Sequence, residues 1–382
     1  MKKFERNNIL FYALLVLFTA QCKKPYEPAV LVKGDTYLVV DGFINTSPAS
    51  VTSIILTRTK NLTDTVVTIA EPGAQVSIQN AEGVSYPLHE TGKGHYESNS
   101  LTLSASTQYK IVITTNANKK YQSDLVSVKP TPAIDSISWQ EDSKGVIVYA
   151  NTHDPANNTH FYRWQYVETY EYHSQLSTPW GVSNGLAYVR DPTQQVNVCY
   201  NTSTSNSVLL GSSAALSQDV ISKAPIAKFL TGDSTLQYRA SFLVTQYALS
   251  PQAYSYWQII QKNSQQLGTL FDLQPSQLEG NFHSIDNPNE PVVGYISATN
   301  SQEKRIFINK TDLTGWPSDF GGSYQCIQIR VPVNPTNFLI IDNTDTSYAP
   351  YYFITSGPLV LAKKVCLDCT LSGGVTTKPS FW

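Results

Sequence analysis

One short segment constrains the fold of this chain more than any other. Residues 250–267 carry a strong helical pattern inside a sequence that is otherwise dominated by strand signals. The hydroxyl of Ser250 can cap the first turn, and Pro251 suits the first helical position because it has no N–H to leave unpaired. Apolar side chains recur at helical spacing, at Ala253, Tyr256, Trp257, Ile260 and Leu267. We therefore expect one principal helix packed on a sheet, with Tyr256 and Trp257 buried against it.

The remainder of the chain predicts a mainly β protein with two domains. Residues 32–130 contain about seven short β-branched runs separated by turn signals, a pattern typical of an immunoglobulin-like or transthyretin-like β-sandwich. Two prolines at Lys129–Pro132 mark the expected boundary. Residues 131–382 then form a larger β-rich domain. Within it, Tyr162, Trp164 and Tyr166 occupy every second position of a strand and therefore share one face. Residues 173–235 are rich in Ser, Thr and Asn, and we expect long loops with short strands there.

The first 21 residues are typical of a lipoprotein signal peptide. A basic start precedes an apolar run from Ile9 to Phe18, which is too short to span a bilayer because a mature helix needs about 20 residues. Small residues and then Cys22 follow this run, so we expect Cys22 to carry lipid. Residues 22–31 would form a tether. These features predict an outer-membrane lipoprotein and leave open whether it faces the cell surface or the periplasm. An ordinary cleaved signal with a chance cysteine is the alternative.

Composition narrows the classes of partner. The formal net charge is −2 and charged residues make up 15% of the chain, which gives no basic surface for nucleic acid. No phosphate-binding glycine loop occurs in the sequence, and we expect no cofactor.

Four cysteines remain if Cys22 carries lipid: Cys199, Cys326, Cys366 and Cys369. An even number in an oxidising compartment favours two disulfides. A direct bridge across Cys366-Leu-Asp-Cys369 would be strained, so we expect each of these two cysteines to reach Cys199 or Cys326 and to fasten the C-terminal tail to the body. A zinc site of four thiolates and a redox-active CxxC are alternatives, each with a weaker signal.

Ordered motifs along the mature chain resemble a Bacteroidota lipoprotein family that is catalogued as a domain of unknown function, number four-two-four-nine. The resemblance rests on Ala248–Trp257, Gly268–Asp272, Pro275–Gln277, Gly280-Asn281, Asp286–Pro288, Pro291–Tyr295, Pro132–Ser136, Tyr162–Trp164 and the tail Cys366–Trp382. It implies an outer-membrane lipoprotein of the kind commonly encoded beside TonB-dependent receptors. It implies no activity and no ligand residues.

Several motifs suggest chemistry, but each has a plainer interpretation. Gly181–Gly185 has the letters of the GxSxG nucleophile elbow, which needs a strand before it and a helix after it, whereas residues 186–190 have a strand pattern. We therefore expect a loop. His153, Asp154 and His160 could bind a metal in a turn, although surface polar loops explain them. Residues 286–290 offer oxygens without the glycine of a calcium loop, so we expect a plain turn there. The other histidines are His89, His95, His173 and His283, and none forms a close pair on a helix.

The chain thus favours binding over catalysis. We expect a non-enzymatic lipoprotein that assists a TonB-dependent receptor in nutrient uptake. One rival is a glycan-binding protein, in which Tyr170, Tyr172, Trp180 and Tyr188 near the long loops stack on sugar. Another rival is a hydrolase acting on polysaccharide or peptide, which requires two or more perturbed acidic or histidine groups around a concave site.

Overall fold

The computed structural model describes residues 36–60, 68–183, 186–265, 280–317, 326–331, 347–354 and 358–382. The predicted signal peptide, Cys22 and the tether lie outside these ranges. Residues 38–382 form one compact unit, which is mainly β as predicted. No helix in the described ranges is long and apolar enough to cross a membrane.

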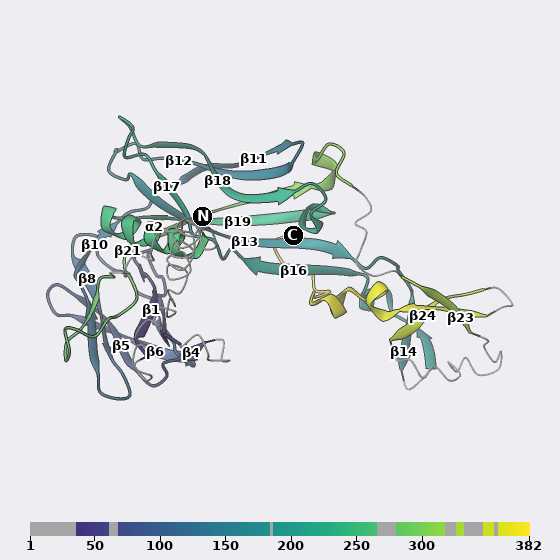
Figure 1. Cartoon of the computed structure of the whole chain (residues 1–382), viewed down its shortest axis with the longest axis horizontal. Helices are drawn as coiled ribbons and strands as arrows, with labels where there is room; N and C mark the ends of the chain where they lie inside the picture. Colours follow the sequence, from purple (N-terminus) through teal and green to yellow (C-terminus); the bar gives the residue numbers. More distant parts are fainter. Residues whose placement is uncertain are drawn as a thin grey trace, which may run out of the picture. The chain divides into compact units, whose positions relative to one another are not determined.

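The N-terminal strands build one sheet that almost closes on itself (Figure 1). Its principal strands are β1 (Leu38–Gly42), β3 (Ser53–Arg58), β5 (Gln75–Asn80), β6 (Ser85–Gly92), β7 (His95–Ser98), β8 (Gln108–Thr114), β9 (Lys120–Ser123) and β10 (Val126–Lys129). The hydrogen-bonded path starts at β1 and ends at β2 (Ile44–Asn45), which follows β1 directly in the chain. Alternate side chains point inward, so Ile54, Tyr96 and Ile111 are fully buried in a common core. The expected sandwich layers therefore belong to one continuous, nearly closed sheet.

A segment far along the chain completes this first core. Strand β20 (Phe282–Ser284) pairs with β9, and β21 (Ala298–Thr299) pairs in parallel with both β10 and β2. Phe282, Val292 and Ile296 are buried in the same cluster as the N-terminal strands. The boundary expected at residues 129–132 therefore does not divide the two cores cleanly along the sequence.

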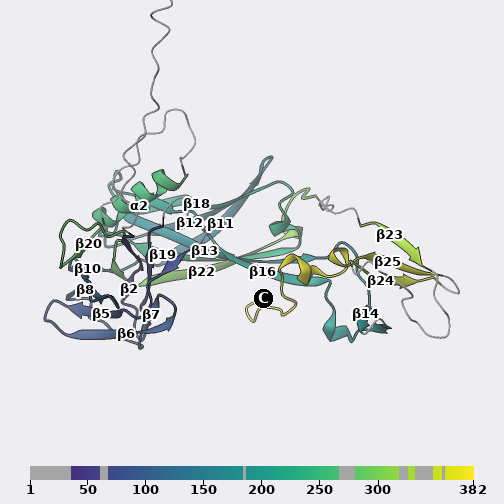
Figure 2. The same cartoon turned by 60° about the horizontal axis from the view of Figure 1, so that its bottom comes forward.

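Two further sheets pack face to face around a second core. The first sheet has the strand order β11 (Ile134–Asp142), β12 (Gly145–His153), β18 (Val220–Leu230). The second has the strand order β16 (Val198–Thr204), β13 (Phe161–His173), β19 (Arg239–Ala248), β22 (Ser301–Asn309). Strand β17 (Leu209–Ser212) also pairs with β13. Figure 2 shows these strands running alongside one another. Tyr162 and Trp164 point into this core, and Tyr166 packs against it, which confirms the alternation predicted for β13.

The predicted helix is confirmed as α2 (Pro251–Gln265). The Oγ of Ser250 accepts a hydrogen bond of 3.1 Å from the N–H of Ala253, so the predicted cap is present. Ala253 and Tyr256 are buried, as their spacing indicated, whereas Trp257, which we also expected to be buried, is half-buried. The predicted end near residue 267 lies outside the described residues.

The segment expected to be the domain boundary, residues 129–132, is hydrogen-bonded to strands of the second core and to Asn300. The N–H of Thr131 donates to Oδ1 of Asn300 at 2.7 Å, and its Oγ1 accepts from the N–H of Ala248 at 2.9 Å. The carbonyl of Pro132 accepts a bond of 2.9 Å from the amide of Gln246, whose own Oε1 accepts from the Trp164 indole at 2.8 Å. These bonds explain why residues 38–382 behave as one unit.

Residues 173–235 contain more strand than we predicted. Besides β16 and β17, they hold β14 (Trp180–Ser183), β15 (Leu186–Val189) and the eleven-residue β18. Strand β18 was missed because Pro225 and two lysines interrupt its apolar pattern. Register shifts in its pairing with β12 and a positive φ at Lys223 accommodate these residues as bulges.

Candidate functional site

Two disulfides fasten the C-terminal tail to the body, as predicted. Cys199 of β16 is bonded to Cys369, which begins the short helix η5 (Cys369–Ser372). Cys326 is bonded to Cys366, which ends η4 (Lys364–Cys366). Each cysteine of the CxxC pair thus reaches a distant partner. All four sulfurs are in disulfide bonds, which rules out the zinc-thiolate alternative in this state and leaves no free thiol for a redox CxxC.

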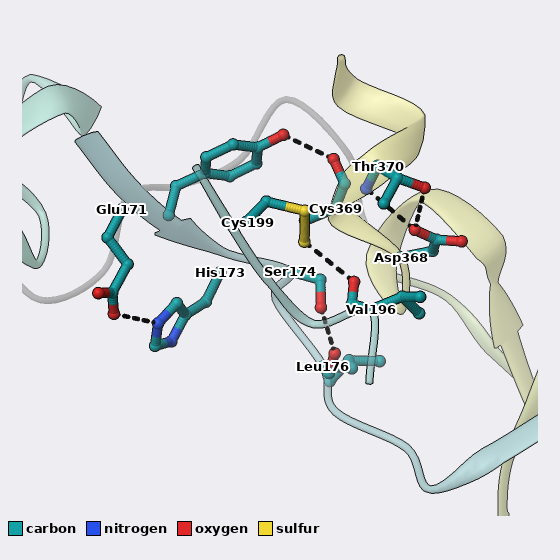
Figure 3. Close-up of a disulfide and its surroundings, with 10 residues drawn as sticks. Glu171, His173, Ser174, Leu176, Val196, Cys199, Asp368, Cys369 and Thr370 are labelled. Atoms are coloured by element: carbon teal, nitrogen blue, oxygen red, sulfur yellow. Dashed lines mark hydrogen bonds and ion pairs between the residues drawn. A yellow bond between two sulfur atoms is a disulfide. The ribbon is translucent and has the colours of Figure 1, made fainter. Parts of the chain in front are cut away.

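The surroundings of the first disulfide lock the tail in place (Figure 3). The hydroxyl of Tyr172 donates to the carbonyl of Cys369 at 2.6 Å, and the N–H of Cys369 donates to the carbonyl of Val196 at 2.8 Å. The sulfur of Cys369 also lies 2.9 Å from that carbonyl oxygen, a close contact and not a hydrogen bond, because a disulfide carries no proton. Asp368 caps η5 through the N–H of Thr370 at 2.9 Å.

One glycine makes this close packing possible. A Cβ at Gly374 would lie 2.4 Å from the Tyr172 hydroxyl and 2.8 Å from Cβ of Cys199, so a larger residue would push the tail away from β13 and β16. Next to it, Tyr200 and Val375 exchange two backbone hydrogen bonds of 2.8 and 3.0 Å. Three features therefore hold the tail against β13 and β16: the Cys199–Cys369 disulfide, the β-bridge between Tyr200 and Val375, and the close packing at Gly374. We call these three features the clamp.

The clamp holds a small module that we define as β14, β15 and the sheet β23 (Gln328–Val331), β25 (Leu359–Lys363), β24 (Tyr348–Phe353). Oγ1 of Thr178 donates to the carbonyls of Pro350 and Tyr351 at 3.1 and 2.8 Å, which ties the hairpin β14–β15 to β24. The ring of Trp180 lies edge-on to that of Phe353, with the ring centroids 4.5 Å apart. We call this the clamped module. It joins residues more than 150 positions apart in the sequence.

Four of the sixteen exposed large apolar side chains among the described residues lie in the hairpin of the clamped module. Leu186, Tyr188 and Val189 are 45%, 44% and 62% exposed, and Val182 on β14 is 40% exposed. Tyr188 lies against Gly181, where a Cβ would come within 2.5 Å of its ring. The sequence 180–189 contains no charged residue. Exposed apolar surface of this kind marks an interaction site more often than chance, because water disfavours it.

The GxSxG motif lies within this hairpin. Gly181 and Ser183 belong to β14, and β15 follows where a nucleophile elbow requires a helix. Our expectation of a loop was therefore wrong for residues 181–183, while the strand predicted after the motif is confirmed. The better signal was Asn184-Gly185 between two apolar runs, since this dipeptide is the strongest short-range mark of a β-hairpin.

A buried polar cluster offers the arrangement closest to catalytic chemistry. The hydroxyls of Tyr162 and Ser213 both donate short hydrogen bonds to the carboxylate of Asp219, and Nδ1 of His160 lies 3.3 Å from Oγ of Ser213. In a hydrolytic triad the histidine stands between the serine and the acid, whereas here the serine stands between them. Ser213 has no exposed surface, and burial followed by the bond to Asp219 raises the pKa of Tyr162. This cluster suits the packing of two loops better than attack on a substrate.

The other histidines lie apart from it. His153 pairs with Asp135, with 2.8 Å from Nδ1 to the carboxylate, and this bond raises the pKa of His153. His173 stacks on Tyr238 with ring centres 3.7 Å apart and contacts Glu171 at 2.8 Å. His283 contacts the amide of Gln122. His89 and His95 lie on the adjacent strands β6 and β7. Within the described ranges, no three His, Cys, Asp or Glu residues are arranged to hold a metal ion.

The acidic loop 286–290 serves the first core. Oδ2 of Asp286 accepts from the N–H of Lys120 at 2.8 Å, and Glu290 accepts from the Tyr121 hydroxyl at 2.6 Å. Burial and then the bond to Glu290 raise the pKa of Tyr121 to about 12. These carboxylates are therefore engaged in holding β9, consistent with the plain turn that we preferred to a calcium loop.

The remaining candidates for a catalytic or sugar-binding site have less support. Burial raises the pKa of Glu168, although a 2.8 Å bond from Ser203 opposes the shift. An open hollow of about 770 Å³ lies on the N-terminal sheet, and its lining contains no Phe, Tyr or Trp ring for stacking on sugar: Ala74, Gln75, Val76, Ser77, Pro87, Leu88, His89, Glu90, Val112 and Thr114. Of the four aromatic residues proposed for sugar binding, Tyr170, Tyr172 and Trp180 are half-buried and Tyr188 is exposed. They do not form one exposed row.

The model of a family described as "Domain of unknown function (DUF4249)" matches residues 23–305. The search of curated proteins gives no match.

Proposed function

Because this chain belongs to the DUF4249 family, we propose that it is a non-enzymatic lipoprotein of the outer membrane that grips a protein partner. The partner is a TonB-dependent receptor, and the complex takes up a nutrient. The resemblance described above supplies the expectation of lipidation at Cys22 and of a receptor as the neighbour. The family match itself carries no activity.

The observation that supports this proposal most is the clamped module. Its hairpin displays uncharged apolar side chains to water, while two disulfides and the Thr178 bonds hold its base. A surface that is costly to expose and rigidly held suits binding to another protein, because rigidity lowers the entropy lost on association. Disulfides also persist in an exported protein and are rare in the cytosol.

The hydrolase alternative has less support. The Asp219 cluster places its serine between acid and histidine and away from solvent. Glu168 is a single carboxyl with a raised pKa, whereas glycoside hydrolysis uses two carboxyl groups about 5–10 Å apart.

Affinity purification from detergent-solubilised membranes tests the proposal. The structure suggests a tag inserted in the turn at Glu82-Gly83, where both residues are exposed and nothing lies within 4 Å of a Cβ at Gly83. We expect one β-barrel receptor to be recovered in near-equal amount with the chain. Recovery of the chain alone from gently solubilised membranes would count against the proposal.

A further inference from the structure

The strand β15 has an open edge. Among the described strands it pairs only with β14, with Trp180 opposite Val189 at one end and Ser183 opposite Leu186 at the other. Residues 186–189 make no other backbone hydrogen bond within the described part of the chain. In an antiparallel pair every second residue points its N–H and C=O away from the partner strand. The outer side of β15 therefore presents unpaired donors and acceptors.

This edge lacks the protection that natural sheets use. Open edges are usually blocked by lysine, proline, an inward-pointing charge or a covering segment. Leu186-Ala-Tyr-Val189 has no charge and no proline, and three of its four side chains are exposed and apolar. By contrast, the edge strand β22 carries Glu303, Lys304 and Arg305. An unprotected apolar edge is suited to pairing with another extended chain.

From this edge we infer that β15 is the site at which the protein partner adds a strand. The inference rests on the proposed function and names the surface that the partner uses. An added strand would bond to the free N–H and C=O groups and lay its own alternate side chains against Leu186 and Tyr188 on one face and Val189 on the other. The partner segment is thus an extended stretch with uncharged, alternating apolar side chains. It belongs to a membrane-embedded β-barrel protein.

A lipid surface fits the same hairpin less well. Acyl chains would cover the apolar side chains of both faces, but they offer no hydrogen bonds to the open edge, and an unpaired backbone group is strongly disfavoured in hydrocarbon. A strand supplied by a protein both covers the apolar side chains and bonds to the open backbone groups.

Site-specific photo-crosslinking tests the inference on the full chain in its native membrane. Benzoylphenylalanine is placed at Ala187 or at Val189, two positions that share a face of the hairpin. We expect both probes to capture the same β-barrel protein, on residues two positions apart in one segment, because paired strands keep register. Capture of a second copy of this chain, of lipid, or of nothing would overturn the inference.

Charged substitutions provide the second arm. L186K and V189K should each reduce recovery of the receptor roughly tenfold, since a lysine at an edge opposes pairing. The matched control is L230K, because Leu230 is 64% exposed at the end of β18 and lies outside the hairpin. Equal recovery by all three variants would overturn the inference while leaving the proposed function intact. If the unaltered chain recovers no receptor, the proposed function fails and the inference fails with it.

Discussion

The guanidinium of Arg163 lies 3.9 Å from the centre of the Trp257 ring, which joins the start of β13 to helix α2. Nε of Arg163 makes no hydrogen bond, and burial lowers the pKa of this side chain. The aromatic face therefore supplies the main favourable environment for a cation that is largely removed from water. A second such pair lies elsewhere on the same sheet, where the guanidinium of Arg305 is 3.7 Å from the Phe381 ring.

Replacing Trp257 tests the importance of this stack. W257A should lower the free energy of unfolding by about 2–4 kcal/mol, because it removes both apolar burial and the ring face beneath Arg163. W257F should cost less, since a ring remains. Q252A changes an exposed residue of the same helix and should be close to neutral. Denaturant titration measures all three, and equal stabilities for W257A and Q252A would refute the role assigned to the stack.

The two disulfides should differ in their contribution to stability. They close segments of 170 and 40 residues, for which the chain-entropy model gives roughly 5 and 4 kcal/mol. The double variant C199S/C369S should therefore unfold at a lower temperature than C326S/C366S, and its tail should be cut first by protease. If C326S/C366S is the less stable protein, the clamp at Cys199 is not the principal one.

The Asp219 cluster should prove structural. Y162F removes one of the two hydroxyl donors to a buried carboxylate and should cost about 1–3 kcal/mol. Y188F is the control, since the Tyr188 ring is exposed on the hairpin and its hydroxyl makes no hydrogen bond to any residue that the structure describes. Thermal unfolding compares the two. A Y162F protein that unfolds at the same temperature as Y188F and the unaltered chain would contradict the role that we give to this cluster.

The pKa of His153 should depend on Asp135. Asp135 raises the pKa of His153 above its ordinary value of about 6.5, so the ion pair stabilises the fold below that pH and is lost as the pH rises through the raised pKa. D135N should bring the His153 pKa down toward the ordinary value, as NMR of the imidazole protons would report. An unchanged midpoint in D135N would mean that Asp135 is not the cause.

Local patterns predicted some elements well and missed others for identifiable reasons. The helix was evident because Ser250, Pro251 and the spacing of Ala253 and Tyr256 all agree. Strain across a three-residue spacing predicted that Cys366 and Cys369 each reach a distant cysteine, but not which of Cys199 and Cys326 each one takes. The contribution of Phe282 and Ala298 to the first core could not be predicted, since it depends on pairing across more than 150 residues.

The clamped module shows the same limit. Asn184-Gly185 indicates a hairpin locally, but only the fold brings Thr178 to the carbonyls of Pro350 and Tyr351. Exposure of Leu186 and Val189 likewise follows from what the fold leaves uncovered. The alternation of residues along a strand predicts which side chains share a face. Which of the two faces is buried depends on tertiary packing.

Native mass spectrometry of the complex purified from membranes tests the central claim most directly. The account predicts one copy of this chain, with lipid mass at Cys22, bound to one copy of a β-barrel receptor. An unmodified chain that travels alone, with no receptor at comparable abundance, would contradict it.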